Sequence, residues 1–267
     1  MADNAMIKVM HLTKRFGHFT AVDDISFNVS RGELFALLGP NGAGKSTTIK
    51  MLTTLLKPSS GKLELNGHNV VANPDLTRRS FGIVFQDPSL DNDLTAYENM
   101  ELHAVMYGVP HSETAPRIEE LMRLVELWDR RQSLVRTYSG GMKRRLEIAR
   151  GLLHHPKVLF LDEPTLGLDA QTRTLLWDYV GNLAKEKEMT ILFTTHYLEE
   201  AEANATRIGI IDHGKLLVIG TAQELRQETN TNSLEEAYLA LTGRELRDEE
   251  VDSHEAWRQR QRSRNMR

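Results

Sequence analysis

Polar and apolar residues alternate through much of the first thirty positions, which is the period expected of strands with one buried face. The alternation includes Ile7 and Val9, and then Ile25, Phe27 and Val29. A continuous apolar run follows and predicts a strand that is covered on both faces. By these criteria we predict strands at 34–38, 62–65, 81–85, 158–161, 189–194, 207–211 and 215–219.

The middle of the chain changes to a helical period and interrupts this series of strands. Thr95 and Glu98 form a capping box, which predicts that a helix begins there and runs to about Tyr107. The other predicted helices are 46–56, 117–127, 139–153, 170–185, 222–227 and 233–241. This order of elements indicates an α/β sheet into which a helical segment has been inserted.

The composition is that of an ordinary globular protein, with 40% apolar and 26% charged residues among 267. A net charge of -4 gives no support to a nucleic-acid binder that relies on a basic field, and we expect no nucleic-acid partner. Cysteine is absent, which excludes disulfides and thiolate metal sites. We find neither a signal peptide nor an apolar stretch long enough to span a bilayer, so a membrane role would require a partner.

The segment after the 34–38 strand matches the pattern G-x-x-x-x-G-K-[ST] and is followed by a predicted helix. Glycines let the backbone N–H groups surround phosphates, and the helix directs its positive end toward them. Lys45 offers a charge to the β- and γ-phosphates, and Ser46 offers a hydroxyl to Mg²⁺. The residues of this predicted phosphate site are Gly39, Pro40, Asn41, Gly42, Ala43, Gly44, Lys45, Ser46 and Thr47.

Two acids, Asp162 and Glu163, end the 158–161 strand. Neighbours in a strand point to opposite faces, but the chain turns at the carboxyl end, where open α/β sheets bind ligands. Both acids can then reach one ligand. We predict that Asp162 binds Mg²⁺ and that Glu163 accepts a proton from the attacking water or orients it. The alternative is a solvated acid pair at the start of a loop.

These residues, with further segments, resemble the nucleotide-binding subunits of ABC transporters over about residues 6–225. One of these segments resembles the signature motif of that family and consists of Tyr138, Ser139, Gly140, Gly141 and Met142. Gln86 resembles the Q-loop glutamine of the family, and 166–168 with Asp169 resembles its D-loop. His196 resembles the switch histidine, and Phe16 resembles the aromatic that stacks on adenine. The resemblance implies an α/β phosphate-loop NTPase core sheet, an N-terminal antiparallel β subdomain and an inserted helical subdomain at about 87–156. These form one domain, 1–242, followed by a charged and flexible tail, 243–267.

A helix N-terminus preceded by Ser139, Gly140 and Gly141 is an anion site. Since the chain already has one phosphate loop, we expect this second site to cap the γ-phosphate of an ATP bound to a second copy or a paralogue. The family works in this way. The alternative is a simple N-cap by Ser139. The family's common motif has Leu and Gln where this chain has Tyr138 and Met142, but the backbone donors and the Ser139 hydroxyl remain, so we expect function to survive.

The resemblance also implies roles for single residues. Gln86 would contact Mg²⁺ and couple the helical insertion to it, and His196 would contact the γ-phosphate and hold Glu163 and water in line. The predicted catalytic residues are thus Lys45, Glu163 and His196, and the metal ligands are Ser46, Gln86 and Asp162. The alternatives are a buried loop aromatic for Phe16, a loop glutamine for Gln86 and a structural histidine for His196.

The run Lys143, Arg144 and Arg145 after Met142 resembles the ABC-2 type branch of exporters, and 233–243 resembles the tail of drug-exporter ATPases in it. Three adjacent helical residues point in different directions, so we expect them to be solvated or next to phosphate. The resemblance implies an ATPase subunit that energises export of a drug-like, lipid or polysaccharide substrate through a separate permease, at the cytoplasmic face of the membrane. The alternatives are a soluble ABC ATPase acting on ribosomes or DNA, and an importer subunit.

Overall fold

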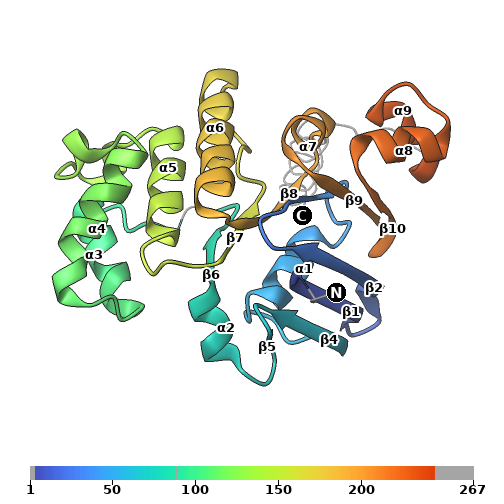
Figure 1. Cartoon of the computed structure of the whole chain (residues 1–267), viewed down its shortest axis with the longest axis horizontal. Helices are drawn as coiled ribbons and strands as arrows, with labels where there is room; N and C mark the ends of the chain where they lie inside the picture. Colours follow the sequence, from blue (N-terminus) through green and yellow to red (C-terminus); the bar gives the residue numbers. More distant parts are fainter. Residues whose placement is uncertain (1–3, 88, 244–267) are drawn as a thin grey trace, which may run out of the picture.

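The computed structural model describes residues 4–87 and 89–243. Figure 1 shows an antiparallel sheet beside the N-terminus, a second sheet in the middle, and a group of helices at one end. We call that group the helical lobe; it contains α3 (Ala96–Met106), α4 (His111–Leu124) and α5 (Gly140–Gly151). Within the described ranges, no helix has both the length and the apolar character needed to cross a bilayer.

The antiparallel sheet has the strand order β2-β1-β4-β5. Its strands are β1 (Ala5–Phe16), β2 (Phe19–Ser30), β4 (Ser60–Leu65) and β5 (His68–Asn69). The alternating residues face one side of it, and Ile7, Val9, Ile25 and Val29 are all buried. They belong to the same apolar cluster as Phe35, so this sheet packs onto the start of the second one. The period-two prediction is confirmed.

The second sheet has six strands in the order β10-β9-β3-β8-β7-β6. They are β3 (Leu34–Leu38), β6 (Phe81–Val84), β7 (Val158–Asp162), β8 (Thr190–Thr195), β9 (Arg207–Asp212) and β10 (Lys215–Gly220). The strands from β9 to β6 run parallel, whereas β10 is antiparallel to β9. Because β8 lies between β3 and β7, the carboxyl ends of these three parallel strands meet at one edge, which confirms the predicted α/β fold class.

The predicted helices are present, with differences at their ends. α3 begins after Thr95 and has the predicted capping box. α1 (Lys45–Leu52) ends at Leu52 rather than Leu56, because the chain turns at Thr54, which has a left-handed φ of 65°. α4 begins at His111 rather than Arg117. Its first turns are polar and contain Pro116 on the exposed side, so the apolar period gave no signal there.

Two helices were not predicted: α2 (Pro74–Ser80) and α7 (Leu198–Asn204). Each has seven residues, which is too short for a helical period to be recognised. The remaining helices are η1 (Trp128–Arg130), η2 (Val135–Thr137), α6 (Ala170–Lys187), α8 (Ala222–Thr229) and α9 (Leu234–Thr242). The structure is described as far as Gly243, so the rest of the predicted tail, 244–267, lies outside the described residues.

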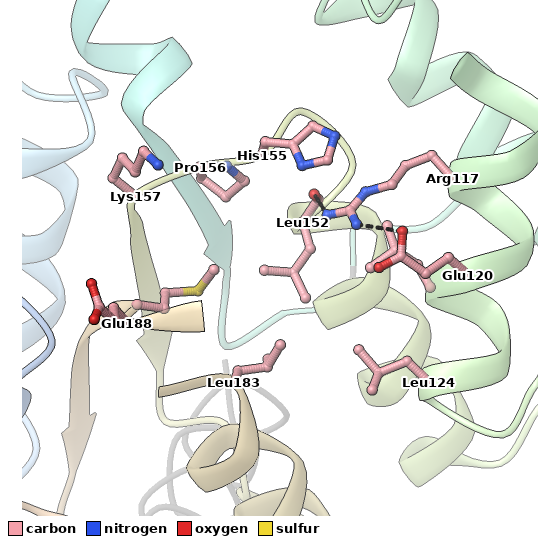
Figure 2. A pocket seen from close by; sticks show the side chains of 11 residues that line it. Arg117, Glu120, Leu124, Leu152, His155, Pro156, Lys157, Leu183 and Glu188 are labelled. Atoms are coloured by element: carbon pink, nitrogen blue, oxygen red, sulfur yellow. Dashed lines mark hydrogen bonds and ion pairs between the residues drawn. The ribbon is translucent and has the colours of Figure 1, made fainter. Parts of the chain in front are cut away.

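A cavity of about 310 Å³ lies between the helical lobe and the second sheet (Figure 2). On the lobe side, Arg117 donates to Glu120 at 2.7 Å and to the carbonyl oxygen of Leu152 at 2.9 Å. On the sheet side, Lys157 and Glu188 lie just before β7 and β8. The cavity is therefore at the amino ends of these strands, opposite the carboxyl edge. The helical lobe and the second sheet are not in full contact there.

Candidate functional site

The glycine loop between β3 and α1 approaches neighbouring backbone closely at two positions. A Cβ on Gly39 would lie 2.1 Å from the carbonyl oxygen of Ile211. Gly44 has a φ of +106°, and a Cβ there would lie 2.6 Å from the carbonyl oxygen of Ala21. Neither position admits a side chain unless backbone moves. This close fit brings the loop to the amino end of α1, where free backbone N–H groups suit an anion.

Lys45 is 4% exposed and lies over this loop. Its Nζ donates to the carbonyl oxygens of Gly39 at 2.6 Å and Pro40 at 3.1 Å. The same Nζ lies 3.1 Å from Glu163 Oε1. One cation therefore connects the glycine loop with the end of β7, and a phosphate chain within the loop would lie beside it.

Asp162 is held by two hydroxyl groups from neighbouring elements. Its Oδ1 accepts from Ser46 at 3.0 Å and from Thr194 at 2.6 Å. Burial raises the pKa of Asp162, and the two hydrogen bonds only partly offset this effect. Hydroxyl and carboxylate oxygens side by side are the donors that Mg²⁺ prefers, so these residues fit the ion. The part of the chain that the structure describes contains no cluster of three or more acidic or histidine metal ligands.

Glu163 has a left-handed φ of 46°, which turns the chain at the end of β7. The backbone N–H of Glu163 donates to Thr194 Oγ1 at 2.9 Å. Its Oε2 lies 3.3 Å from His196 Nδ1, so its two oxygens face His196 and Lys45. Burial by itself raises the pKa of Glu163, but its close contact with His196 and the charge of Lys45 outweigh it and lower the pKa. Glu163 is therefore ionised at neutral pH.

Thr194 was not predicted as a site residue. Its hydroxyl donates to Asp162 and accepts from the Glu163 backbone, so one β8 side chain orients both acids at the end of β7. Thr194 precedes His196 by two positions, and strand alternation is the one signal that could have pointed to it.

A cavity of about 430 Å³ opens beside the glycine loop. Two aromatic side chains lie at it, Phe16 and Phe19, which are paired across the end of the β1–β2 hairpin and are 48% and 63% exposed. Phe16 is thus not the buried loop aromatic of the alternative interpretation. Phe19 was missed, although it is aromatic like Phe16 and directly follows the turn after it. The other residues that line this cavity are Ala21, Pro40, Asn41, Gly42, Ala43, Gly44, Lys45, Ser46, Thr47, Gln86 and Glu163.

Gln86 follows β6 and is attached to the helix after the signature motif. Arg144 of α5 donates to its carbonyl oxygen at 3.0 Å and also to the carbonyl oxygen of Phe85. Arg144 is paired with Glu147 at 3.2 Å, and both are buried. Burial lowers the pKa of Arg144, and Glu147 partly opposes this. The expectation that Arg144 is solvated or beside phosphate was therefore wrong, because its side of α5 faces the chain after β6.

Glu147 and Arg150 extend this attachment by one more turn of α5. Glu147 Oε1 accepts from the backbone N–H of Ser89 at 2.7 Å and from its hydroxyl at 3.2 Å. Arg150 donates to the carbonyl oxygen of Ser89 at 2.8 Å. Gln86 and Ser89 are therefore both hydrogen-bonded to α5.

Three predicted residues, Gly39, Asp162 and His196, do not line the cavity but contact residues that do. The signature motif and Asp169 do not line it either. Ser139 is exposed and accepts from the Met142 N–H at 3.3 Å, so it is the N-cap of α5. Asp169 is exposed and accepts from the Thr172 N–H at 2.9 Å, as the N-cap of α6. The two turns touch, since a Cβ on Gly141 would lie 2.4 Å from Thr172 Cγ2. Ser139, Gly140 and Asp169 are therefore exposed at neighbouring turns, outside the cavity beside the glycine loop.

Tyr138, the first departure from the family's motif, is buried and donates to the carbonyl oxygen of Arg130 at 2.9 Å. Burial raises the pKa of its phenol. The hydroxyl that distinguishes it from leucine thus has a partner inside the helical lobe. The second departure, Met142, is partly buried and packs against the apolar core.

Comparisons with known proteins agree with this geometry. The ABC transporter family model matches residues 22–166. The daunorubicin resistance ATP-binding protein DrrA3 of Streptomyces coeruleorubidus is 42% identical over 235 residues, which are 88% of this chain and 74% of that protein. The linearmycin resistance ATP-binding protein LnrL of Bacillus subtilis is 42% identical over 220 residues, 82% of this chain and 70% of that protein.

Solved structures are similar as well. An ATP-binding subunit of an ABC transporter has a TM-score of 0.81 and 34% identity, covering 89% of this chain and 99% of that one. An ATP-binding cassette, dimeric in a post-hydrolysis state with ADP and Pi, has a TM-score of 0.73 and 27% identity, covering 81% of this chain and 98% of that one. The chain therefore belongs to the ABC transporter family, as one of its ATP-binding, ATP-hydrolysing subunits.

Proposed function

We propose that this chain hydrolyses ATP with Mg²⁺ at the edge formed by β3, β7 and β8, and thereby energises export through a separate membrane subunit. The observation that carries the proposal is the position of Glu163, whose carboxylate lies between Lys45 and His196 beside the glycine loop. The relatives' names support export, since they include resistance proteins for daunorubicin and linearmycin and a Nod factor export protein. The proposed substrate class is a drug-like, lipid or polysaccharide molecule.

In the proposed binding mode, the triphosphate lies in the glycine loop with Lys45 at the β- and γ-phosphates. Phe16 and Phe19 are exposed beside this loop and offer flat rings to the adenine base. The oxygens of Ser46, Asp162 and the Gln86 side chain would hold Mg²⁺, which supplies positive charge to the phosphates when bound.

Glu163 is the proposed base. Its lowered pKa keeps it ionised, so it can accept a proton from a water molecule aimed at the γ-phosphate. His196 lies at its second oxygen and can donate to the same phosphate, which aligns base, water and phosphorus. Thr194 fixes the turn that carries Glu163. Positioning and charge stabilisation supply most of the catalysis in phosphoryl transfer.

The proposed active unit is a dimer, either of two copies or of this chain with a paralogue. Ser139, Gly140 and Asp169 are exposed and lie outside the cavity of their own chain. The free N–H groups at the amino end of α5 suit a γ-phosphate presented by a partner. The similar cassette that was solved as a dimer supports this arrangement.

The proposed membrane subunit docks on the helical lobe near the segment that begins at Gln86. Leu102, Val105 and Met106 form an exposed apolar stripe on α3, which suits a helix of a partner protein. Since Arg144, Glu147 and Arg150 tie that segment to α5, movement at this surface reaches the signature motif. The proposed location is the cytoplasmic face of the membrane, with the chain bound peripherally.

The test is Glu163→Gln, which keeps the shape of the side chain but removes the base. We expect ATP binding to persist, turnover to stop, and ATP to convert the variant into a dimer, measured by ATPase assay and light scattering. Turnover at the wild-type rate would remove Glu163 from the mechanism. A strictly monomeric variant, even together with its membrane component, would remove the nucleotide-sandwich dimer.

A further inference from the structure

Glu200 of α7 is a buried carboxylate that lies outside the described nucleotide cavity, with 8% of its surface exposed. Each of its two oxygens accepts one hydroxyl hydrogen bond. Oε1 accepts from Thr165, and Oε2 accepts from Thr195 at 2.9 Å. Both threonines are also buried, so this cluster lies under the surface of the site.

The two threonines belong to the two loops that carry the reacting side chains. Thr165 lies two positions after Glu163, in the loop that leaves β7, and Thr195 immediately precedes His196 at the end of β8. Glu200 thus connects the loop of the proposed base with that of the histidine beside it. The connection is independent of the direct 3.3 Å contact between Glu163 and His196.

Thr195 extends the connection to the glycine loop. Its hydroxyl accepts from the N–H of Tyr197 at 3.0 Å while donating to Glu200. Its carbonyl oxygen accepts from the N–H of Gly39 at 3.3 Å. The backbone of Thr195 is thus held by the phosphate loop, while Glu200 holds its hydroxyl.

A buried carboxylate is costly unless its oxygens are hydrogen-bonded or paired with a cation. Among the described residues, no lysine or arginine forms an ion pair with Glu200, so the two threonine hydroxyls are its main compensation. Both hydroxyls donate to Glu200, and the Thr195 hydroxyl also accepts from the Tyr197 N–H, which fixes its rotation. Glu200 therefore joins the loop after β7 to the end of β8 through these two hydrogen bonds.

We propose that Glu200 is a positioning residue for ATP hydrolysis, which sets the separation of Glu163 and His196 by holding Thr165 and Thr195. This inference rests on the proposed function, because it assigns Glu200 a part in the same reaction. Glu200 does not line the cavity beside the glycine loop, so its loss affects the alignment of base and histidine more than nucleotide binding. Small misplacements of reacting groups cost rate more than affinity.

The central experiment compares Glu200→Ala with Glu202→Gln, in the full chain with its membrane subunit. Glu202 lies on the same helix, but it is partly exposed and paired with Arg226 at 2.6 Å. We expect Glu200→Ala to lower kcat by about 10- to 100-fold while KM for ATP stays within about twofold. Glu202→Gln leaves both constants unchanged. Glu200→Gln keeps one acceptor oxygen and gives an intermediate kcat.

Two further variants keep the inference testable if Glu200→Ala does not fold. Thr165→Val and Thr195→Val each remove one hydroxyl and nearly preserve the shape of the side chain. Each lowers kcat with little change in KM. In a Glu200→Gln background, each valine substitution has a smaller effect than in the wild-type background, because the groups act as one unit.

The inference would be overturned if the Glu200 variants had the same kcat and KM as Glu202→Gln. A parallel loss of ATP affinity and kcat would also overturn it, because that pattern indicates general damage to the site. The proposed function is tested separately by Glu163→Gln. If Glu163→Gln abolishes turnover and Glu200→Ala does not reduce it, the proposed ATPase mechanism stands. Only the positioning role of Glu200 is then wrong.

Discussion

Lys45 Nζ lies 3.1 Å from Glu163 Oε1, and both side chains are almost completely buried. The residue proposed to bind phosphate is thus paired with the residue proposed to activate water. Removing one partner of a buried ion pair leaves the other charge without compensation, which is more costly than replacing both. A substitution of Lys45 or Glu163 should therefore change both the stability of the chain and its reaction with ATP.

Lys45→Ala should weaken ATP binding and also destabilise the chain, by about 3 kcal/mol, because Glu163 keeps its charge in a buried position. The double variant Lys45→Ala/Glu163→Gln should recover part of that loss, since the uncompensated charge is gone. Urea unfolding gives the stabilities and nucleotide titration gives the affinity. Unchanged affinity in Lys45→Ala would contradict the assigned phosphate site.

Thr194→Val should lower the free energy of unfolding by about 1–3 kcal/mol, because it removes the hydroxyl between Asp162 and the Glu163 backbone. ATPase activity should fall too, as both acids lose their orientation. Thr194→Ser keeps the hydroxyl and should retain most of the activity. Thr174→Val is a matched control, since the Thr174 hydroxyl bonds the Ala170 carbonyl on an exposed face of α6. If Thr194→Val and Thr174→Val behave alike, Thr194 has no special role.

Gly39→Ala should abolish ATP binding and lower the free energy of unfolding by about 2 kcal/mol or more, because its methyl group would meet the Ile211 carbonyl oxygen. Gly181→Ala is the opposite case. Gly181 lies within α6 with nothing within 4 Å of an added Cβ, so this variant should gain about 0.5–1 kcal/mol. Both stabilities can be read from denaturant unfolding. A Gly39→Ala variant that binds ATP normally would show that the loop has more space than the structure indicates.

Phe16→Ala and Phe19→Ala should each weaken ATP binding by about 1 kcal/mol or more, through loss of stacking on the base. Inorganic tripolyphosphate has no base, so its affinity should be the same in both variants as in the wild type. Calorimetric titration measures both ligands. An equal loss for ATP and tripolyphosphate would mean that these rings support the loop and do not contact adenine.

His103 of α3 should make stability depend on pH. Burial holds its pKa at about 3, well below the ordinary 6.5, and the charge of Arg150 and the neighbouring His154 add to this effect. Between these values the unfolded chain binds a proton that the folded chain does not. Stability is therefore full above pH 6.5 and falls as the pH is lowered, with a slope of up to about 1.4 kcal/mol per pH unit from His103.

His103→Gln should remove this part of the slope between pH 6 and 4, whereas His111→Gln, at an exposed position at the start of α4, should not. Unfolding free energies in urea at several pH values provide the measurement. His154 also has a pKa lowered by burial, so some slope should remain in the His103 variant. Equal slopes in the two variants would show that His103 is accessible to protons in the folded chain.

The strands were predictable because a buried strand face requires apolar residues at every second position, and a strand buried on both faces requires a largely apolar run. The residues of β7 and β8 are buried throughout, and the apolar runs 158–161 and 191–193 make up most of β7 and the middle of β8. The short α7 left no such record, although it carries Glu200. Motif spacing suggested Lys45, Asp162, Glu163 and His196, but not the order β3-β8-β7 that makes them neighbours. Strand order depends on contacts between distant parts of the chain, which a single sequence does not contain.

The error at Arg144 has a related cause. A basic run on a helix gives no information about which side meets another element, and the answer here depends on how α5 packs against the segment after β6. Thr194 and Phe19 belong to no motif, so their relation to the site required the structure. The roles of the site residues stay predictions until the variants are measured.

The contact between Gly141 and Thr172 limits what evolution can change. A methyl group at 141 would overlap the Thr172 side chain, so a larger residue at one position demands a smaller one at the other. The space at the start of α5 is thus set by a side chain of α6. A residue larger than glycine should become acceptable at 141 when Thr172 is replaced by glycine or alanine.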